Sequence, residues 1–298
     1  MTDVRPSPTY GGQALIEGVM IRGTSRAALA VRLPDNTIHS EECHLPSFST
    51  GKRRRIPFVR GVLVLGETLV VGVRALTRSA NLAVEEEDNA TPLSDWAITL
   101  TLISSALIGI GIFFLSPLFI ARVIGQIVDM STVMLNAFEG LTRLALLVLY
   151  VWAIGKMADV KRVYAYHGAE HMTVHAVENG DTLSVENIRK YPKEHPRCGT
   201  AFLLTVMLVA LIVFSIVHSE SILISAALRV VLIPVIASLS YEVIKWSASH
   251  SNSWMGKLSS TPGLWLQKIT THNPQSDQIQ VAIVAMEAAM ALEESHQR

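Results

Sequence analysis

Four long apolar runs dominate the hydrophobic pattern of the chain. Two of them contain no charged residue, and the other two contain only one or two. A helix needs roughly 20 mainly apolar residues to cross a bilayer, and each run approaches that length. The pattern therefore predicts a mainly α polytopic membrane protein with about four transmembrane helices, at Trp96–Ala121, about Val133–Gly155, Cys198–Val217 and about Ser221–Tyr241.

Three charged residues interrupt these runs. Glu139 and Arg143 lie four residues apart, so they can pair on one helix face and lower each other's cost in lipid. Arg229 lies within the fourth run, where it either extends toward the membrane surface or pairs inside the bundle. The link between the last two runs is only three residues long, which predicts an antiparallel helical hairpin.

The N-terminal part predicts a small β-containing unit. Residues 1–10 have the composition of a disordered tail, and a turn at Pro34-Asp35-Asn36 separates two strand-like segments, Ala27–Leu33 and Thr37–Cys43. The glycines between residues 11 and 23 lack the Gly-Lys-Ser/Thr of a nucleotide-binding loop, so we interpret them as residues of tight turns. The basic run Lys52–Arg55 is interpreted as a topology determinant that also touches anionic lipid.

Residues 58–84 predict one amphipathic helix with an unusual polar stripe. Because the polar residues recur at helical spacing and most of the others are apolar, we expect an interfacial or re-entrant helix. The stripe consists of Arg60, Glu67, Arg74, Arg78 and Asn81.

The C-terminal part predicts two shorter helices. A turn at Thr261-Pro262-Gly263 would precede a short helix at Leu264–Thr270, and Asn273-Pro274 would end it. Gln278–Glu294 has helical periodicity and is expected to dock on the cytoplasmic domain. The predicted division of the chain is therefore 1–10, 11–55, 56–94, 95–155, 156–197, 198–245 and 246–298.

Composition and charge support a membrane location. Half of the residues are hydrophobic and 17% are charged, against about 25% in an average soluble domain. All but three of the 25 basic residues lie before residue 95, between residues 156 and 197, or after residue 241. By the positive-inside tendency, we expect a multi-pass protein of the inner (plasma) membrane with both termini in the cytoplasm. Membrane lipid is thus an expected partner. Nucleic acid is not expected, because the sequence has no basic face interleaved with aromatic residues.

The residues that indicate chemistry lie between positions 167 and 198. Five of them fall at offsets 0, 3, 4, 8 and 11, which return to one face of an α-helix, and a His and a Cys follow closely. Imidazoles, carboxylates and a thiol in one short segment are typical of a site for a divalent metal, with zinc as the expected ion. These residues are His167, Glu170, His171, His175, Glu178, His195 and Cys198.

The spacing His167-x-x-Glu170-His171 is the inverted zincin arrangement. In such sites the two His side chains hold zinc and the Glu acts as general base, while a third ligand comes from farther along the chain. Glu242, at the end of the fourth apolar run, is a candidate for that ligand. Two alternatives stay open: a closed structural site made by His171, His175, His195 and Cys198, and a polar network without metal.

Several motifs resemble the YqhQ-like family of bacterial membrane proteins, a family of unknown function tagged as a predicted metal-dependent enzyme. They cover nearly the whole chain, in the family's order. The resemblance implies a membrane location and a metal, but no substrate. Met172 is a departure, because many members have Lys there. The motifs are GGQALIEGVMIRG at 11–23, YHGAEHMTVHAVE at 166–178, HPRCGT at 195–200 and PGLWLQKITT at 262–271.

Two hypotheses for the function follow. The first is a membrane-embedded zinc hydrolase, with peptidase as one candidate activity, that works at the cytoplasmic face. The second is a non-enzymatic membrane assembly or regulatory protein in which a structural metal fastens the cytoplasmic loop. The number of protein ligands separates them, because a catalytic zinc keeps one position open.

Overall fold

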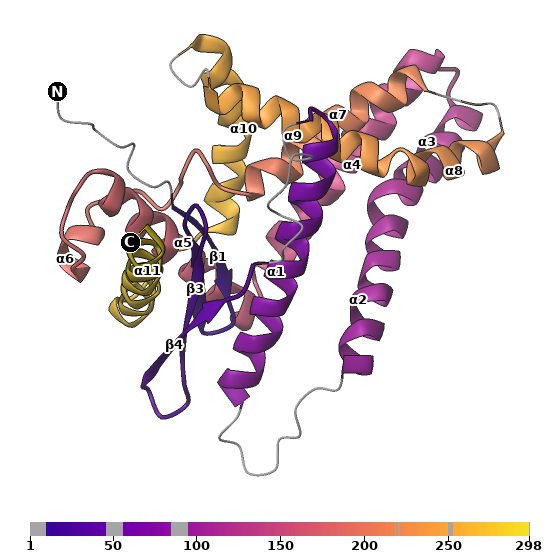
Figure 1. Cartoon of the computed structure of the whole chain (residues 1–298). Helices are drawn as coiled ribbons and strands as arrows, with labels where there is room; N and C mark the ends of the chain where they lie inside the picture. Colours follow the sequence, from indigo (N-terminus) through magenta and orange to yellow (C-terminus); the bar gives the residue numbers. More distant parts are fainter. Residues whose placement is uncertain are drawn as a thin grey trace.

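The computed structural model describes residues 10–45, 56–84, 95–217, 219, 221–249 and 253–297. The protein is mainly helical, with one small antiparallel sheet near the N-terminus (Figure 1). This agrees with the predicted fold class at that level. The basic run Lys52–Arg55 and the predicted disordered tail, apart from Tyr10, lie outside the described residues.

The sheet is a four-stranded meander in the order β1-β2-β3-β4. The predicted hairpin is confirmed as β3 (Ala27–Arg32) and β4 (Ile38–Cys43), with Asn36 at a φ of 67° in the turn. The glycine-rich segment before it forms two further strands, β1 (Gly11–Leu15) and β2 (Gly18–Arg22). Gly11, Gly12 and Gly18 therefore lie within strands, and the expectation of glycine in a tight turn holds for Gly23, whose N–H donates to the Arg26 carbonyl at 2.8 Å in the link before β3.

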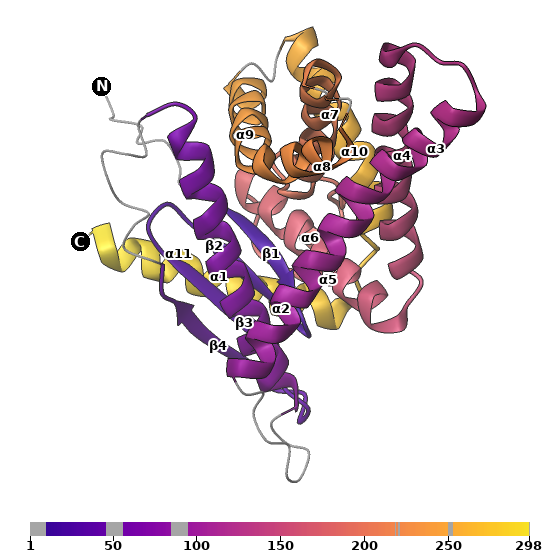
Figure 2. The same cartoon turned by 90° about the vertical axis from the view of Figure 1, so that its right-hand side faces the viewer.

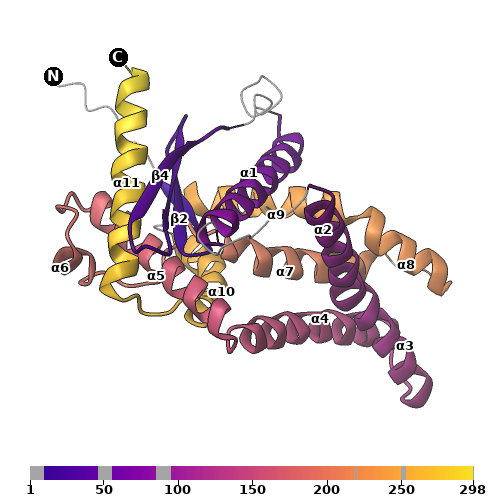
Figure 3. The same ribbon diagram turned by 90° about the horizontal axis from the view of Figure 1, so that it is seen from below.

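Helices cover both faces of the sheet, so this part of the protein has three layers (Figures 2 and 3). Side chains alternate along the strands: Val19 and Ile21 pack toward α5 (Ala158–Glu178) and α11 (Ser276–Gln297). Met20 points the other way, toward α1 (Val59–Val84). The predicted C-terminal helix is thus confirmed, and it packs on the sheet.

The α1 helix is confirmed in extent, and much of its polar stripe faces the rest of the protein. Arg60 pairs with Glu242, Glu67 pairs with Arg22, and Arg78 Nε lies 2.9 Å from Glu41 Oε1. The exposed side of the helix is mainly apolar, although Arg74 of the stripe is also exposed. The accessible apolar residues are Val59, Val62, Leu65, Leu69 and Leu76.

Seven segments form the apolar part of the protein, which extends away from the sheet (Figure 3). The first three segments form one continuous helix with a π-helical turn, η3, in its middle. The last two helices of this part meet at a bend of 46°. The segments are α2 (Asp95–Ile110), η3 (Gly111–Leu115), α3 (Ser116–Ile127), α4 (Thr132–Ile154), α7 (Thr200–Ile216), α8 (Ile222–Val231) and α9 (Ile233–Ser249).

Four full transmembrane spans are more than this geometry supports. Among the described residues, Thr99–Ile127 and Thr132–Ile154 are long and apolar enough to cross a membrane, and α8 with α9 makes a third if the bent pair is one span. The α7 helix contains only 17 residues. Pro234 is the second residue of α9, and because proline has no N–H to donate, the ladder of hydrogen bonds is interrupted there.

The two remaining helices lie near the candidate site. The short α6 covers Val185–Ile188, and α10 runs from Trp254 to Thr270 without a break. The predicted turn at Thr261-Pro262-Gly263 is therefore wrong. Leu266 and Gln267 of α10 are fully buried, so tertiary packing holds the helix through Pro262.

Candidate metal centre

The α5 helix carries the motif residues and lies between the sheet and the C-terminal segments. Gly168 and Ala169 are buried, and a Cβ atom at position 168 would overlap the carbonyl oxygen of His272. Glycine there lets the link between α10 and α11 approach the helix closely. His272 N donates to the Tyr164 carbonyl at 2.8 Å, which fixes this link.

Three candidate ligands converge at the middle of α5. The ligand atoms of His167, His171 and Cys198 all lie within 4.8 Å of one another. His167 Nε2 is 3.2 Å from Cys198 Sγ, and the His167 and His171 ring centroids are 4.4 Å apart. Cys198 precedes α7, so the site joins two elements that are distant in sequence.

Backbone carbonyl groups fix the orientation of the two imidazoles. His167 Nδ1 lies 2.9 Å from the Thr270 carbonyl oxygen, and His171 Nδ1 lies 2.6 Å from that of Lys193. Because a carbonyl oxygen can only accept, both Nδ1 atoms carry the proton, and each Nε2 presents a lone pair, that of His167 toward Cys198 Sγ. Metal-binding His residues typically donate their second ring N–H in this way. Two nitrogen lone pairs and a sulfur thus point at a common volume.

Glu170 is buried beside this volume. The residue is only 3% exposed, its Oε2 lies 3.4 Å from His171 Nε2, and the Gly12 N–H donates to the carboxylate. Burial raises the pKa of Glu170 to about 8, while burial and the neighbouring His167 lower the pKa of His171 well below its usual value. The site therefore disfavours net charge of either sign, and His171 is neutral at physiological pH.

A second group lies further along α5. Ligand atoms of His175, Glu178 and His195 also lie within 4.8 Å of one another, and His195 Nε2 is 3.4 Å from Glu178 Oε2. The rings of His171 and His195 have centroids 5.8 Å apart, so the two groups are adjacent. Arg197 pairs with Glu178, which is partly exposed, and burial lowers the pKa of His195 to about 4. An arginine on its carboxylate makes this group less suited to a cation.

Two expectations about ligands are not met by this geometry. Glu242 is not in either group, because its carboxylate accepts from Arg60 and from the Phe58 N–H. The closed set of His171, His175, His195 and Cys198 is divided between the two groups.

Sequence reasoning missed several residues that hold the site together. The side-chain amide of Gln267 in α10 forms two hydrogen bonds with the backbone of His195. Its Oε1 accepts from His195 N at 2.7 Å, and its Nε2 donates to His195 O at 3.0 Å. Glu17 pairs with Arg162 and accepts from Tyr166, next to His167. Both Glu17 and Gln267 lie in the motifs shared with the family, which is the signal that could have indicated them.

Gly12 is the third missed residue, and a cavity adjoins it. A Cβ atom at Gly12 would lie 2.8 Å from Glu170 Cγ, so only glycine lets β1 approach the carboxylate. The cavity has a volume of about 310 Å³ and is lined by Gly12, Arg22 and Thr68, and by Arg197 next to Cys198. Glu170 itself is not among the residues that line the cavity, and Gly12 contacts both.

Fold and site together define a mainly helical protein with long apolar helices and a buried cluster of His, Cys and Glu. The chain matches the family described as "Protein of unknown function (DUF1385)" over residues 56–292. It is 31% identical to the "Uncharacterized protein YqhQ" of Bacillus subtilis (strain 168), over 98% of this chain and 96% of that protein. The chain therefore belongs to this YqhQ-like family of unknown function. No solved structure matches it.

Proposed function

We propose that the protein is a zinc-dependent hydrolase whose metal is held by His167, His171 and Cys198. The observation that supports this most is the convergence of three ligand atoms within 4.8 Å beside a buried carboxylate. Zinc with three protein ligands keeps one tetrahedral position for water or substrate, which is the arrangement of catalytic sites. Bound there, zinc would supply Lewis-acid activation of water.

The protein's own groups supply the remaining chemistry. Glu170 lies between the two His residues in sequence and is the proton acceptor in this proposal. Its Oε2 is near His171 Nε2, and the Gly12 N–H orients the carboxylate. The carbonyl groups of Thr270 and Lys193 keep both imidazoles in the tautomer that can bind a cation. Substrate would enter through the cavity at Gly12 and Arg197.

We also propose that the apolar helices insert into the plasma membrane and that both chain ends lie in the cytoplasm. Exposed apolar side chains on α1, α2 and α4 support this, because water would hydrate them at a cost. Near the end of α4, the Val151 carbonyl accepts from Tyr164 of α5, and α7 begins just after Cys198. The cluster would then lie at the cytoplasmic face.

A structural metal is the second candidate, and the position of Glu170 favours it. A carboxylate oxygen 3.4 Å from His171 Nε2 could serve as a fourth ligand and close the site. In that case the metal would fasten Cys198, and the segment before it, to α5. The protein would then be a non-enzymatic assembly or regulatory protein of the membrane.

Metal content and function of two variants separate these proposals. Purified full-length protein would be analysed by inductively coupled plasma mass spectrometry, and each variant would be tested for complementation of a deletion strain. For a hydrolase, Glu170→Gln keeps its zinc but fails to complement, since removal of a general base costs roughly 100- to 10,000-fold in rate. For a structural site, the same variant loses zinc.

His171→Ala and a surface control complete the design. His171→Ala should lose zinc under either proposal, because one of three or four ligands is removed. Glu186→Gln, on the exposed surface of α6, should match the wild type in zinc and in complementation. Unchanged zinc in a folded His171→Ala variant would refute both proposals.

A further inference from the structure

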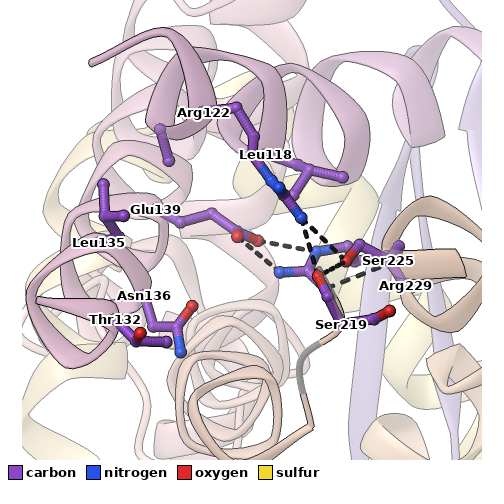
Figure 4. Close-up of a pocket in the computed structure, with 10 residues that line it drawn as sticks. Leu118, Arg122, Thr132, Leu135, Asn136, Glu139, Ser219, Ser225 and Arg229 are labelled. Carbon is purple, nitrogen blue, oxygen red and sulfur yellow. Dashed lines mark hydrogen bonds and ion pairs between the residues drawn. The ribbon is translucent and has the colours of Figure 1, made fainter. Parts of the chain in front are cut away.

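A second polar cavity lies among the apolar helices, far from the His cluster. It has a volume of about 230 Å³ and is lined by residues of α3, the start of α4, the link before α8, and α8 itself (Figure 4). The α4 helix runs from this cavity at Thr132 to the side of α5 at Ile154. At 1.5 Å per residue, the helix separates the two sites by roughly 30 Å.

One carboxylate at this cavity, that of Glu139, forms ion pairs with two arginines. Arg143 Nη2 lies 2.7 Å from Glu139 Oε1, and Arg229 donates through Nε at 3.0 Å and through Nη2 at 2.6 Å to the two oxygens. Figure 4 shows the Glu139 carboxylate facing the Arg229 guanidinium; both side chains line the cavity. Both oxygens of Glu139 are therefore engaged.

The buried charges do not cancel. All three side chains are at most 5% exposed, and the ion pairs that the described residues make with Arg143 and Arg229 involve only Glu139. Among the residues that the structure describes, none forms a hydrogen bond with the buried Arg143 Nη1. Both guanidiniums also lie about 5 Å from the centroid of the Phe214 ring. One unit of positive charge thus stays buried among apolar helices, which is costly unless a counter-ion is present.

We propose that this cavity binds a phosphate group, carried by an anionic lipid headgroup or free as inorganic phosphate. Arginine recognises phosphate through paired N–H donors, and Arg229 and Arg122 both line the cavity. The side chains of Thr132 and Asn136 add neutral donors at the α4 end. A net positive cavity with several donors favours an oxoanion over a cation or an apolar ligand.

The position of the cavity fits a molecule that enters from the membrane side opposite the His cluster. Arg122 is half-buried and donates to the Ser219 carbonyl at 2.8 Å, so it lies at the entrance, whereas Arg229 lies at the base. If the apolar helices cross the membrane as proposed above, this entrance is at the outer leaflet. The charge argument itself does not depend on the metal or on the hydrolase activity.

Phosphate binding by purified full-length protein in a neutral detergent tests the proposal. Isothermal titration with inorganic phosphate would be compared with native mass spectrometry of protein carrying phosphatidylglycerol or uncharged diacylglycerol. Arg122→Gln should weaken binding about ten- to hundredfold, because one charge-assisted hydrogen bond is lost. Glu139→Gln should strengthen binding about tenfold, since it raises the buried positive charge. Arg189→Gln, an exposed arginine near α6, should change nothing.

Each outcome has one interpretation. Inorganic phosphate that responds to these variants, without retention of phosphatidylglycerol, identifies a site for the free anion. Retention of phosphatidylglycerol over diacylglycerol, lost in Arg122→Gln, identifies a lipid headgroup. If neither ligand responds to Arg122→Gln in a folded protein, the proposal is overturned, even if Glu139→Gln fails to fold.

Discussion

Two adjacent glycines give a matched test of how the sheet is fitted to the candidate metal centre. A Cβ atom at Gly12 would lie 2.5 Å from the Met20 carbonyl oxygen, 2.8 Å from Glu170 Cγ and 2.9 Å from Glu170 Oε1. Ordinary contacts of this kind need about 3.3 Å or more, so β1 or Glu170 must move by several tenths of an ångström. At Gly11, a Cβ atom would meet nothing within 4 Å.

The expected energies follow from these contacts. Overpacking at Gly12→Ala should destabilise the protein by about 1–3 kcal/mol. Gly11→Ala should stabilise it by about 0.4–1 kcal/mol, because alanine restricts the unfolded chain more than glycine does. Thermal unfolding in detergent, followed by tryptophan fluorescence, should therefore separate the two variants, with Gly12→Ala melting at the lower temperature.

A double-mutant cycle ties the effect to Glu170. Glu170→Ala removes two of the three atoms that the new methyl group would meet. The loss of stability caused by Glu170→Ala should therefore be at least about 1 kcal/mol smaller in the Gly12→Ala background than in the wild-type protein. Equal stability of Gly11→Ala and Gly12→Ala, or additive effects with Glu170→Ala, would show that β1 does not press on the carboxylate.

Three further predictions concern ligands, pH and topology. Glu242→Gln should leave the zinc content unchanged and lower stability only modestly, as measured by mass spectrometry and thermal unfolding; loss of zinc would return Glu242 to the ligand set. For metal-free protein, the raised pKa of Glu170 means that the folded state holds an extra proton between about pH 4.5 and pH 8. That contribution to stability is lost as pH rises through this window, so Glu170→Gln should remove part of the decline in melting temperature. Reporters placed at Asp181 and at the C-terminus should report the cytoplasm, and one placed between residues 116 and 136 the outside; the reverse would refute the topology.

Local patterns in the sequence predicted those elements whose periodicity is strong. The helix at 58–84, the hairpin at Ala27–Cys43 and the C-terminal helix follow from spacing alone. Strands β1 and β2 were missed because glycines interrupt the alternation that marks a strand. The sequence around Pro262 predicts a turn, but burial of one face of α10 keeps this segment helical. Propensity is a weak guide where tertiary packing opposes it.

The candidate site was predictable only where its residues share one helix. The offsets on α5 placed His167, Glu170 and His171 together, and Cys198 was close in sequence. Glu242 does not join the cluster, because the partner of a distant carboxylate depends on the fold, and in this fold Glu242 pairs with Arg60. The carbonyl groups that orient the imidazoles could not be predicted, since every residue has one and no side chain marks it.

The order in which the chain is made bears on the covered sheet described above. Strands β1–β4 leave the ribosome long before α11, which covers their Val19 and Ile21 face. At roughly 5–20 residues per second, the strands wait on the order of ten seconds or longer for that helix. The carbonyl of Thr270, which orients His167, is made 103 residues after that histidine. The His cluster therefore cannot be complete until residue 270 has emerged, and a chain truncated before residue 270 lacks the group that orients His167.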